Sequence, residues 1–179
     1  LPILDGSSGP FVELLSEAGL AEQAPPRKTL KVLKPVEVRE GVKFARLSPG
    51  KGFEMRVAID FSSKAIGRQT ISFAMQPGAF ARDVAWARTF GFLKEVEALR
   101  AMGKARGGSL DNAVVVDGDA ILNEGGLKVP DEFVRHKLLD VIGGGQATVD
   151  PNAPQAPTGA PSDEHGQFAA TVLASTEDA

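Results

Sequence analysis

Residues 53–60 read Phe-Glu-Met-Arg-Val-Ala-Ile-Asp, an alternation of apolar and polar side chains that decides the fold class. Successive side chains of a β-strand point to opposite faces, so the four apolar residues would share one buried face. Residues 71–75 repeat this pattern with Ile71, Phe73 and Met75. The sequence therefore predicts two strands of a sheet with one face against a core.

More strands are predicted on both sides of this pair. Segments 30–38 and 42–47 flank Glu40-Gly41, and the turn residues of segment 49–52 lead into Phe53, which together predict an antiparallel meander. Further along, residues 113–117 (Ala-Val-Val-Val-Asp) have the composition of a buried strand.

Three segments have helical spacing instead. After Gly9-Pro10 come Phe11, Leu14, Leu15 and Ala18 at helical spacing, with Gly19 behind them. Residues 94–102 end at Gly103, and residues 131–140 begin with two carboxylates beside the positive end of a helix dipole. The predicted fold class is therefore α+β, with an antiparallel sheet packed against helices. The first helix is expected to be a remnant of something larger.

The composition changes twice along the chain, which predicts three parts. Paired prolines within residues 21–27 indicate a linker, so residues 1–27 form the first part and residues 28–143 a domain. Residues 144–179 hold prolines among Gly, Ala, Ser and Asp with little apolar periodicity before 168–173. This last part is predicted to be a disordered tail.

The overall composition excludes several classes of function. The chain has 179 residues, a net charge of −3 and no cysteine, and its Lys and Arg residues form no basic stripe. We therefore expect no nucleic-acid partner, no disulfides and no thiolate chemistry. No apolar run approaches the roughly 20 residues that a membrane span needs.

His136 and Asp140 form the candidate metal site. They are four positions apart on a predicted helix, so both side chains project from one face. With no cysteine and two histidines in the chain, a zinc site must be built from imidazole and carboxylate. This pair would supply two ligands of a catalytic zinc; the alternative is an ordinary surface ion pair at helical spacing.

Other residues have both a functional and a structural interpretation. Thr89-Phe90-Gly91-Phe92 would offer a hydroxyl and two rings to a sugar or acyl chain, or form a core strand with a glycine bulge. Lys137 would bind a phosphate, or simply be solvated. Segment 107–112 is interpreted as a structural turn, and His165 as a free imidazole in the tail.

Five motifs together resemble one known family. They are residues 2–7 (Pro-Ile-Leu-Asp-Gly-Ser), 88–92 (Arg-Thr-Phe-Gly-Phe), 107–113 (Gly-Gly-Ser-Leu-Asp-Asn-Ala), 122–124 (Leu-Asn-Glu) and 131–140 (Asp-Glu-Phe-Val-Arg-His-Lys-Leu-Leu-Asp). Their order and spacing resemble UDP-3-O-acyl-N-acetylglucosamine deacetylase from residue 1 to about 143. The resemblance implies a cytoplasmic zinc amidase of Gram-negative lipid A synthesis, built from two similar α+β domains with the active site between them.

The resemblance also implies roles for individual residues. His136 and Asp140 would ligate Zn²⁺, and Thr89 would donate a hydrogen bond to the developing oxyanion. Lys137 would meet the phosphates of the UDP-linked acylated N-acetylglucosamine, while Phe90 and Phe92 would pack against that substrate. Segment 96–115 would form an apolar passage for the acyl chain.

The chain departs from the family pattern at both ends. The family's general-base glutamate and third zinc ligand, a histidine, lie upstream of the Pro-Ile-Leu-Asp-Gly-Ser motif, before this chain starts. Downstream, Gly144 stands where the family has an aspartate, and a later Gly-His pair has no match except the differently ordered sequence around His165.

The expectation is therefore a fragment of the deacetylase that binds zinc weakly and has negligible turnover alone. The alternative is a noncatalytic α+β module that binds an acylated nucleotide sugar or a protein partner.

Overall fold

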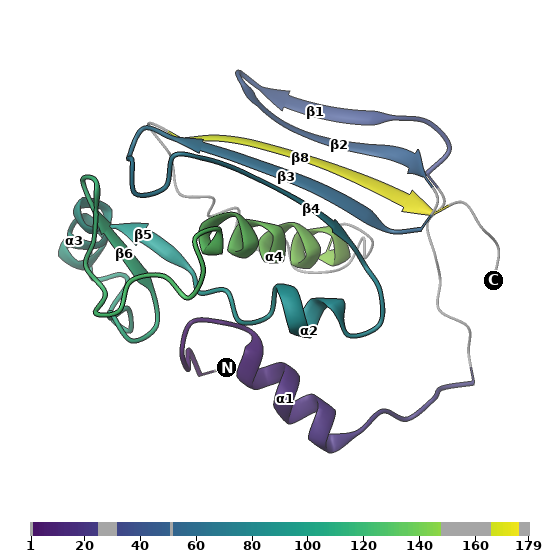
Figure 1. Ribbon diagram of the computed structural model, residues 1–179, viewed down its shortest axis with the longest axis horizontal. Helices are drawn as coiled ribbons and strands as arrows, with labels where there is room; N and C mark the ends of the chain where they lie inside the picture. Colours follow the sequence, from purple (N-terminus) through teal and green to yellow (C-terminus); the bar gives the residue numbers. More distant parts are fainter. Residues whose placement is uncertain (1, 25–31, 51, 148–165, 176–179) are drawn as a thin grey trace.

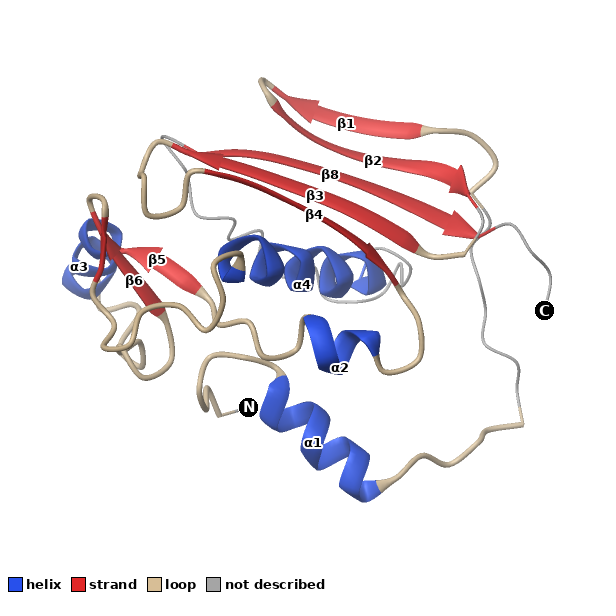
Figure 2. Ribbon diagram, in the orientation of Figure 1, coloured by secondary structure: helices blue, strands red, loops and turns tan. Residues whose placement is uncertain are grey.

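The computed structural model describes residues 2–24, 32–50, 52–147 and 166–175, the last segment by its backbone. Within these residues the elements are α1 Gly9–Ala18, β1 Val36–Glu40, β2 Lys43–Gly50, β3 Glu54–Phe61, β4 Arg68–Ala74, α2 Ala79–Asp83, β5 Phe90–Phe92, α3 Leu93–Ala101, β6 Val114–Asp117, β7 Ala120–Ile121, α4 Glu132–Ala147 and β8 Gly166–Ser175. The α+β prediction is confirmed: Figures 1 and 2 show a sheet above α4, with α2 and α1 below it.

Two sheets are present in the described part of the chain. The larger has the strand order β1-β2-β8-β3-β4, and the smaller has the order β5-β6-β7. Most neighbouring strands are antiparallel, but β2 runs parallel to β8 and β5 runs parallel to β6. The smaller sheet and α3 lie beside one end of α4 (Figure 1).

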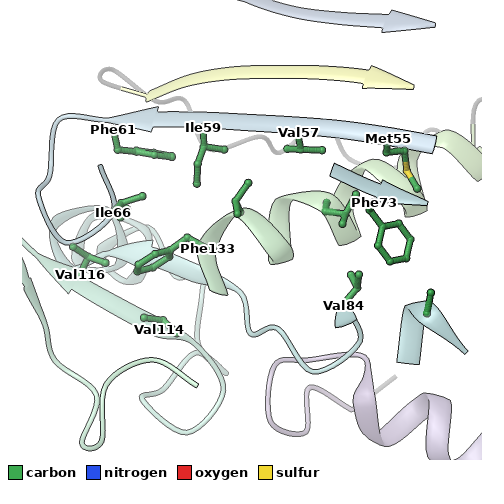
Figure 3. Packing of buried hydrophobic residues seen from close by; sticks show 13 residues of the cluster. Met55, Val57, Ile59, Phe61, Ile66, Phe73, Val84, Val114, Val116 and Phe133 are labelled. Atoms are coloured by element: carbon green, nitrogen blue, oxygen red, sulfur yellow. The ribbon is translucent and has the colours of Figure 1, made fainter. Parts of the chain in front are cut away.

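The core forms where β3 faces α4, as its alternating pattern requires. Met55, Val57, Ile59 and Phe61 point from β3 toward the helix (Figure 3), and their partners on α4 are the buried residues Phe133, Val134 and Leu138. Val114 and Val116 join this cluster from β6. The core therefore fixes α4 against both sheets at once.

The predicted meander is wrong at one position, because β2 and β3 are not neighbours. Strand β8 lies between them, parallel to β2 and antiparallel to β3. The turn residues around Pro49 correctly mark the end of a strand. These residues carry no information about β8, which is more than one hundred positions further along the chain. The sequence therefore did not indicate that β8 separates β2 from β3.

Parts of the predicted tail, residues 144–179, have regular structure, and other parts lie outside the described residues. Residues 148–165 and 176–179, and with them His165, lie outside the described residues. Residues 144–147 continue α4, and residues 166–175 form β8, a strand that the sequence did not predict.

One half of the large sheet has an apolar face that extends beyond the helix layer. Leu47 on β2 and Met55 on β3 both pair with Val172 of β8, so they lie on the same face of the sheet, and Val36 pairs with Leu47. Helix α4 packs on β3 and β4. At the far side Val36, Val38 and Leu47 remain 51%, 71% and 43% exposed.

Within the described residues, none of the helices combines the length and the apolar character that crossing a membrane requires.

Backbone hydrogen bonds join the segment before α1 to residues 85–89. The backbone N–H of Ser8 donates to the Ala85 carbonyl at 2.8 Å, and Thr89 N–H donates to the Gly6 carbonyl at 3.2 Å. Gly6 has a φ of +76°, and a Cβ there would lie 1.7 Å from the backbone oxygen of Asn112. Only glycine fits this contact.

We expect Gly6→Ala to loosen this segment, with Gly19→Ala as the matched control. Gly19 has a similar φ of +79°, but no atom lies within 4 Å of the place a Cβ would occupy, so its substitution costs only the backbone strain, about 1 kcal/mol. Gly6→Ala adds a backbone clash costing about 1–3 kcal/mol more. Amide exchange at Ser8 and Thr89 measures the difference, and equal exchange in the two variants would contradict it.

Candidate functional site

The site is built on the first turns of α4, which are fixed to the large sheet. Gln69 on β4 accepts a hydrogen bond from the Val134 N–H at 3.2 Å through its side-chain oxygen. Its amide nitrogen donates to the Ile66 carbonyl at 3.0 Å. One of the unsatisfied N–H groups at the start of the helix thus finds its partner on a strand, and the helix cannot slide along the sheet without breaking that bond.

His136 lies in the second turn of α4 with only 11% of its side chain exposed. Its Nδ1 is 3.1 Å from the carbonyl oxygen of Ala87. A carbonyl can only accept, so Nδ1 carries a proton, and in the neutral ring Nε2 then keeps its lone pair. Burial lowers the pKa of His136 below its ordinary value, against the opposing effects of Asp140 and the Ala87 carbonyl. The imidazole is therefore neutral near pH 7.

Asp140 lies one turn further along, with its side chain 48% exposed and its Oδ1 3.7 Å from His136 Nε2. Zinc bonds to nitrogen and oxygen are about 2.0–2.2 Å long, so two atoms at this separation can bind the same ion. The neutral imidazole with a free Nε2 is also the form that binds metal. The pair fits zinc, but the described residues contain no group of three His, Cys, Asp or Glu side chains that could hold an ion.

Lys137 lies beside this pair. Its Nζ is 3.3 Å from Asp140 Oδ2 and 5.2 Å from the centre of the Phe90 ring. The ammonium group is thus held over an aromatic face at the edge of the site, which stabilises a cation there.

Thr89, Phe90 and Phe92 lie next to α4 on the strand β5 and just before it. Phe90 pairs with Val114 and Phe92 with Val116 in a regular parallel ladder, without the glycine bulge that was the structural alternative. The Phe90 ring packs edge-on against the Phe133 ring, with 4.9 Å between the ring centroids. Its centroid lies 6.4 Å from that of the His136 ring. Both phenylalanines are partly buried against the core. The structure therefore brings this motif and the His136 helix together.

Segment 107–112 is a turn held by its own side chains. Ser109 N–H donates to the Asn112 side chain at 2.9 Å, which in turn donates to the Gly107 carbonyl at 2.9 Å. Asn123, which is buried, accepts from Val115 N–H and donates to the carbonyls of Leu110 and Ala113, each at 2.8 Å. The side chains of Asn112 and Asn123 thus stabilise the turn and the neighbouring strand, which is a structural role.

A buried ion pair beneath the site went unrecognised in the sequence. Glu132 is fully buried, and its carboxylate accepts from Arg88 Nε at 2.8 Å; the Arg88 side chain is 13% exposed. The sequence pattern identified Glu132 only as a carboxylate beside the positive end of the helix dipole. Glu132 is four positions from His136, so the sequence does indicate that both side chains lie on one face of the helix.

Comparison with known proteins identifies the family of this chain. The family model of UDP-3-O-acyl N-acetylglycosamine deacetylases matches residues 1–145. The chain belongs to this family. A curated UDP-3-O-acyl-N-acetylglucosamine deacetylase from Phenylobacterium zucineum (strain HLK1) is 58% identical over 143 residues, covering 80% of this chain and 49% of the relative. The chain thus spans about half the length of this relative.

The family match ends within α4, two residues beyond the predicted limit. It includes every candidate site residue from Thr89 to Asp140, and it includes α3 with the loop that follows. Residues 166–175, which form β8, lie outside it. The matched region therefore contains all the candidate site residues and every strand of the two sheets except β8.

Burial by itself would raise the pKa of Glu132, but hydrogen bonds from Arg88 and from the Lys128 N–H outweigh it and hold the pKa below its ordinary value. Because the pKa is lower in the folded chain, the resulting stabilisation is complete above the unfolded value of about 4.3. It is lost as the pH falls through the folded value.

We expect Glu132→Gln to lower the free energy of unfolding by about 3–5 kcal/mol near pH 7, because it leaves the Arg88 charge buried without its partner. The difference from the wild type should shrink as the pH falls below about 4. Urea unfolding between pH 3.5 and 7 measures it. Asp131→Asn is the control, since its pair with Arg135 is more exposed and contributes less than about 1 kcal/mol. A difference that stays constant with pH would refute this account.

Proposed function

We propose that this chain carries one side of a zinc-dependent deacetylase site that hydrolyses the N-acetyl group of UDP-3-O-acyl-N-acetylglucosamine and releases acetate. The observation that supports this most is the neutral, buried His136, whose Nε2 lies 3.7 Å from Asp140 Oδ1, in a chain of the deacetylase family. A reaction of this kind belongs to lipid A synthesis in the cytoplasm of Gram-negative bacteria.

His136 and Asp140 would hold the metal ion, each through the atom that faces the other. Bound zinc would supply an acidified water and polarise the amide carbonyl. The Ala87 carbonyl keeps the His136 ring oriented by accepting its Nδ1 proton at 3.1 Å.

Thr89 would donate a hydrogen bond to the oxygen of the acetyl group as negative charge develops on it. Lys137, held between Asp140 and the Phe90 ring, would meet the phosphates of the substrate. Phe90 and Phe92 would offer their partly buried rings to the sugar or to the start of the acyl chain. The acyl chain itself would follow α3 and the loop after it, where burial stabilises it by about 0.8 kcal/mol per methylene.

Two protein ligands hold zinc weakly, so we expect the chain alone to bind Zn²⁺ with low affinity and to release acetate at a negligible rate. Calorimetric titration with Zn²⁺ should show one weak site that His136→Ala and Asp140→Ala abolish. Asp131→Ala, just before the first residue of α4 and paired with Arg135, should leave the titration unchanged. Rapid turnover by the purified chain would overturn the proposed count of site residues.

The alternative, a noncatalytic module that binds the acylated nucleotide sugar, is favoured by the lack of a third ligand group among the described residues. Binding of UDP-3-O-acyl-N-acetylglucosamine discriminates the two functions. Affinity that is unaffected by a chelator and by His136→Ala supports the module, while affinity lost in both cases supports the zinc site.

Reconstitution tests the catalytic role of Thr89. The remainder of the Phenylobacterium relative, co-expressed with this chain, should restore acetate release. In that assembly Thr89→Val should lower the rate by about 10²–10³-fold with little change in zinc content, because one oxyanion donor is removed without loss of volume. Thr70→Val on the exposed side of β4 is the matched control. Equal rates for the two variants would exclude the oxyanion role.

A further inference from the structure

The peptide group between Ala87 and Arg88 lies between two side chains of α4. Its carbonyl oxygen accepts from His136 Nδ1 at 3.1 Å, and its N–H donates to Glu132 Oε1 at 3.1 Å. Glu132 and His136 are four positions apart, so one helix turn separates them on the same face. Because a peptide group is planar and rigid, displacing it at one of these bonds displaces it at the other.

Glu132 is well suited to hold that peptide group in place. Besides the bond from the Arg88 backbone N–H, its carboxylate accepts three more hydrogen bonds. They come from Arg88 Nε at 2.8 Å, from Arg88 Nη2 at 3.0 Å and from the Lys128 backbone N–H at 2.7 Å. The Arg88 guanidinium also donates to the Gly126 carbonyl at 3.0 Å. Four bonds to one buried carboxylate leave it no room to turn.

The next residue is fixed as firmly. Thr89 N–H donates to the Gly6 carbonyl at 3.2 Å, and its carbonyl accepts from Val114 N–H at 2.8 Å. The backbone from Ala87 to Thr89 is therefore bound in turn to α4, to the segment before α1 and to β6. The proposed oxyanion donor and the partner of the proposed metal ligand lie on this one short segment.

We propose that Glu132, together with Arg88, is a positioning residue of the site. Through the Ala87–Arg88 peptide group it holds His136 as the Nδ1–H tautomer with Nε2 facing Asp140, and it fixes the backbone from which Thr89 projects. The inference rests on the proposed function for its use in metal binding. The tautomer and orientation of His136, however, are properties of the metal-free chain.

A role in stability alone does not explain this arrangement. A buried ion pair is often replaced by apolar residues without loss of stability, whereas an apolar residue cannot accept the Arg88 N–H. A hydrogen bond from that N–H to a carboxylate also polarises the peptide group, which makes the Ala87 carbonyl a stronger acceptor for His136. The ion pair thus supports a particular hydrogen bond of the site.

Nitrogen-15 NMR of the imidazole side chains in the metal-free protein tests the proposal. The chain has two histidines, so the spectrum is simple, and His136→Gln assigns the signals. At pH 7.5 the wild type should show His136 as the Nδ1–H tautomer. Glu132→Gln should give a mixture of the two tautomers, and Asp131→Asn should leave the wild-type spectrum.

The double substitution Arg88→Met with Glu132→Met separates positioning from stability, since it removes both buried charges at once. We expect it to regain most of the stability that Glu132→Gln loses while keeping the mixed tautomers. If the folded double variant instead keeps the Nδ1–H tautomer, or if the wild type lacks it, the proposal is overturned. This test remains decisive if Glu132→Gln does not fold.

Titration with Zn²⁺ alone completes the test. Loss of support behind a histidine ligand typically weakens metal binding about 10–100-fold, and we expect a decrease of this size in the double variant. Wild-type affinity in that variant would overturn the proposal. A wild-type chain that binds no Zn²⁺, but whose tautomer depends on Glu132, would refute the zinc site and leave the positioning role standing.

Discussion

The packing of α4 against β3 is the interaction on which the rest of the structure depends. The apolar side of β3 buries Val57 and Ile59 against Phe133, Val134 and Leu138 of the helix. Glu132 and His136 lie in the same two turns of the helix as these apolar residues. Burial of the apolar side chains therefore determines the rotation of α4, and that rotation directs the carboxylate and the imidazole at the segment from Ala87 to Thr89.

The candidate site is assembled from parts that are distant in the sequence. Gln69 fixes the start of α4 to the sheet, Gly6 approaches Thr89 from the segment before α1, and Val114 pairs with the same residue from β6. Each contact is a single hydrogen bond worth about 1 kcal/mol. The bonds with Gly6 and Val114 hold the backbone at Thr89, and the bond with Gln69 holds the helix that carries His136. Together they give the rigidity that an oriented imidazole requires.

Much of this arrangement was predictable because it follows from local periodicity. The alternation in residues 53–60 and 71–75 gave β3 and β4, helical spacing gave α1, α3 and α4, and the spacing of His136 and Asp140 placed their side chains on one face. The insertion of β8 between β2 and β3 was not predictable, since pairing between strands so far apart leaves no local signal. The burial of Glu132 was missed for a related reason: its partner Arg88 is 44 positions away.

The half-covered sheet has a consequence for the behaviour of the free chain. Strand β1 ends the sheet, and on one of its faces Glu37 pairs with Arg39 and Arg46, charges that discourage another strand from adding to the edge. On the other face Val36, Val38 and Leu47 are left in water, within the part of the chain that the structure describes. Contact with other molecules is thus disfavoured along the β1 edge and favoured across this apolar face, where we expect sheets of the free chain to stack.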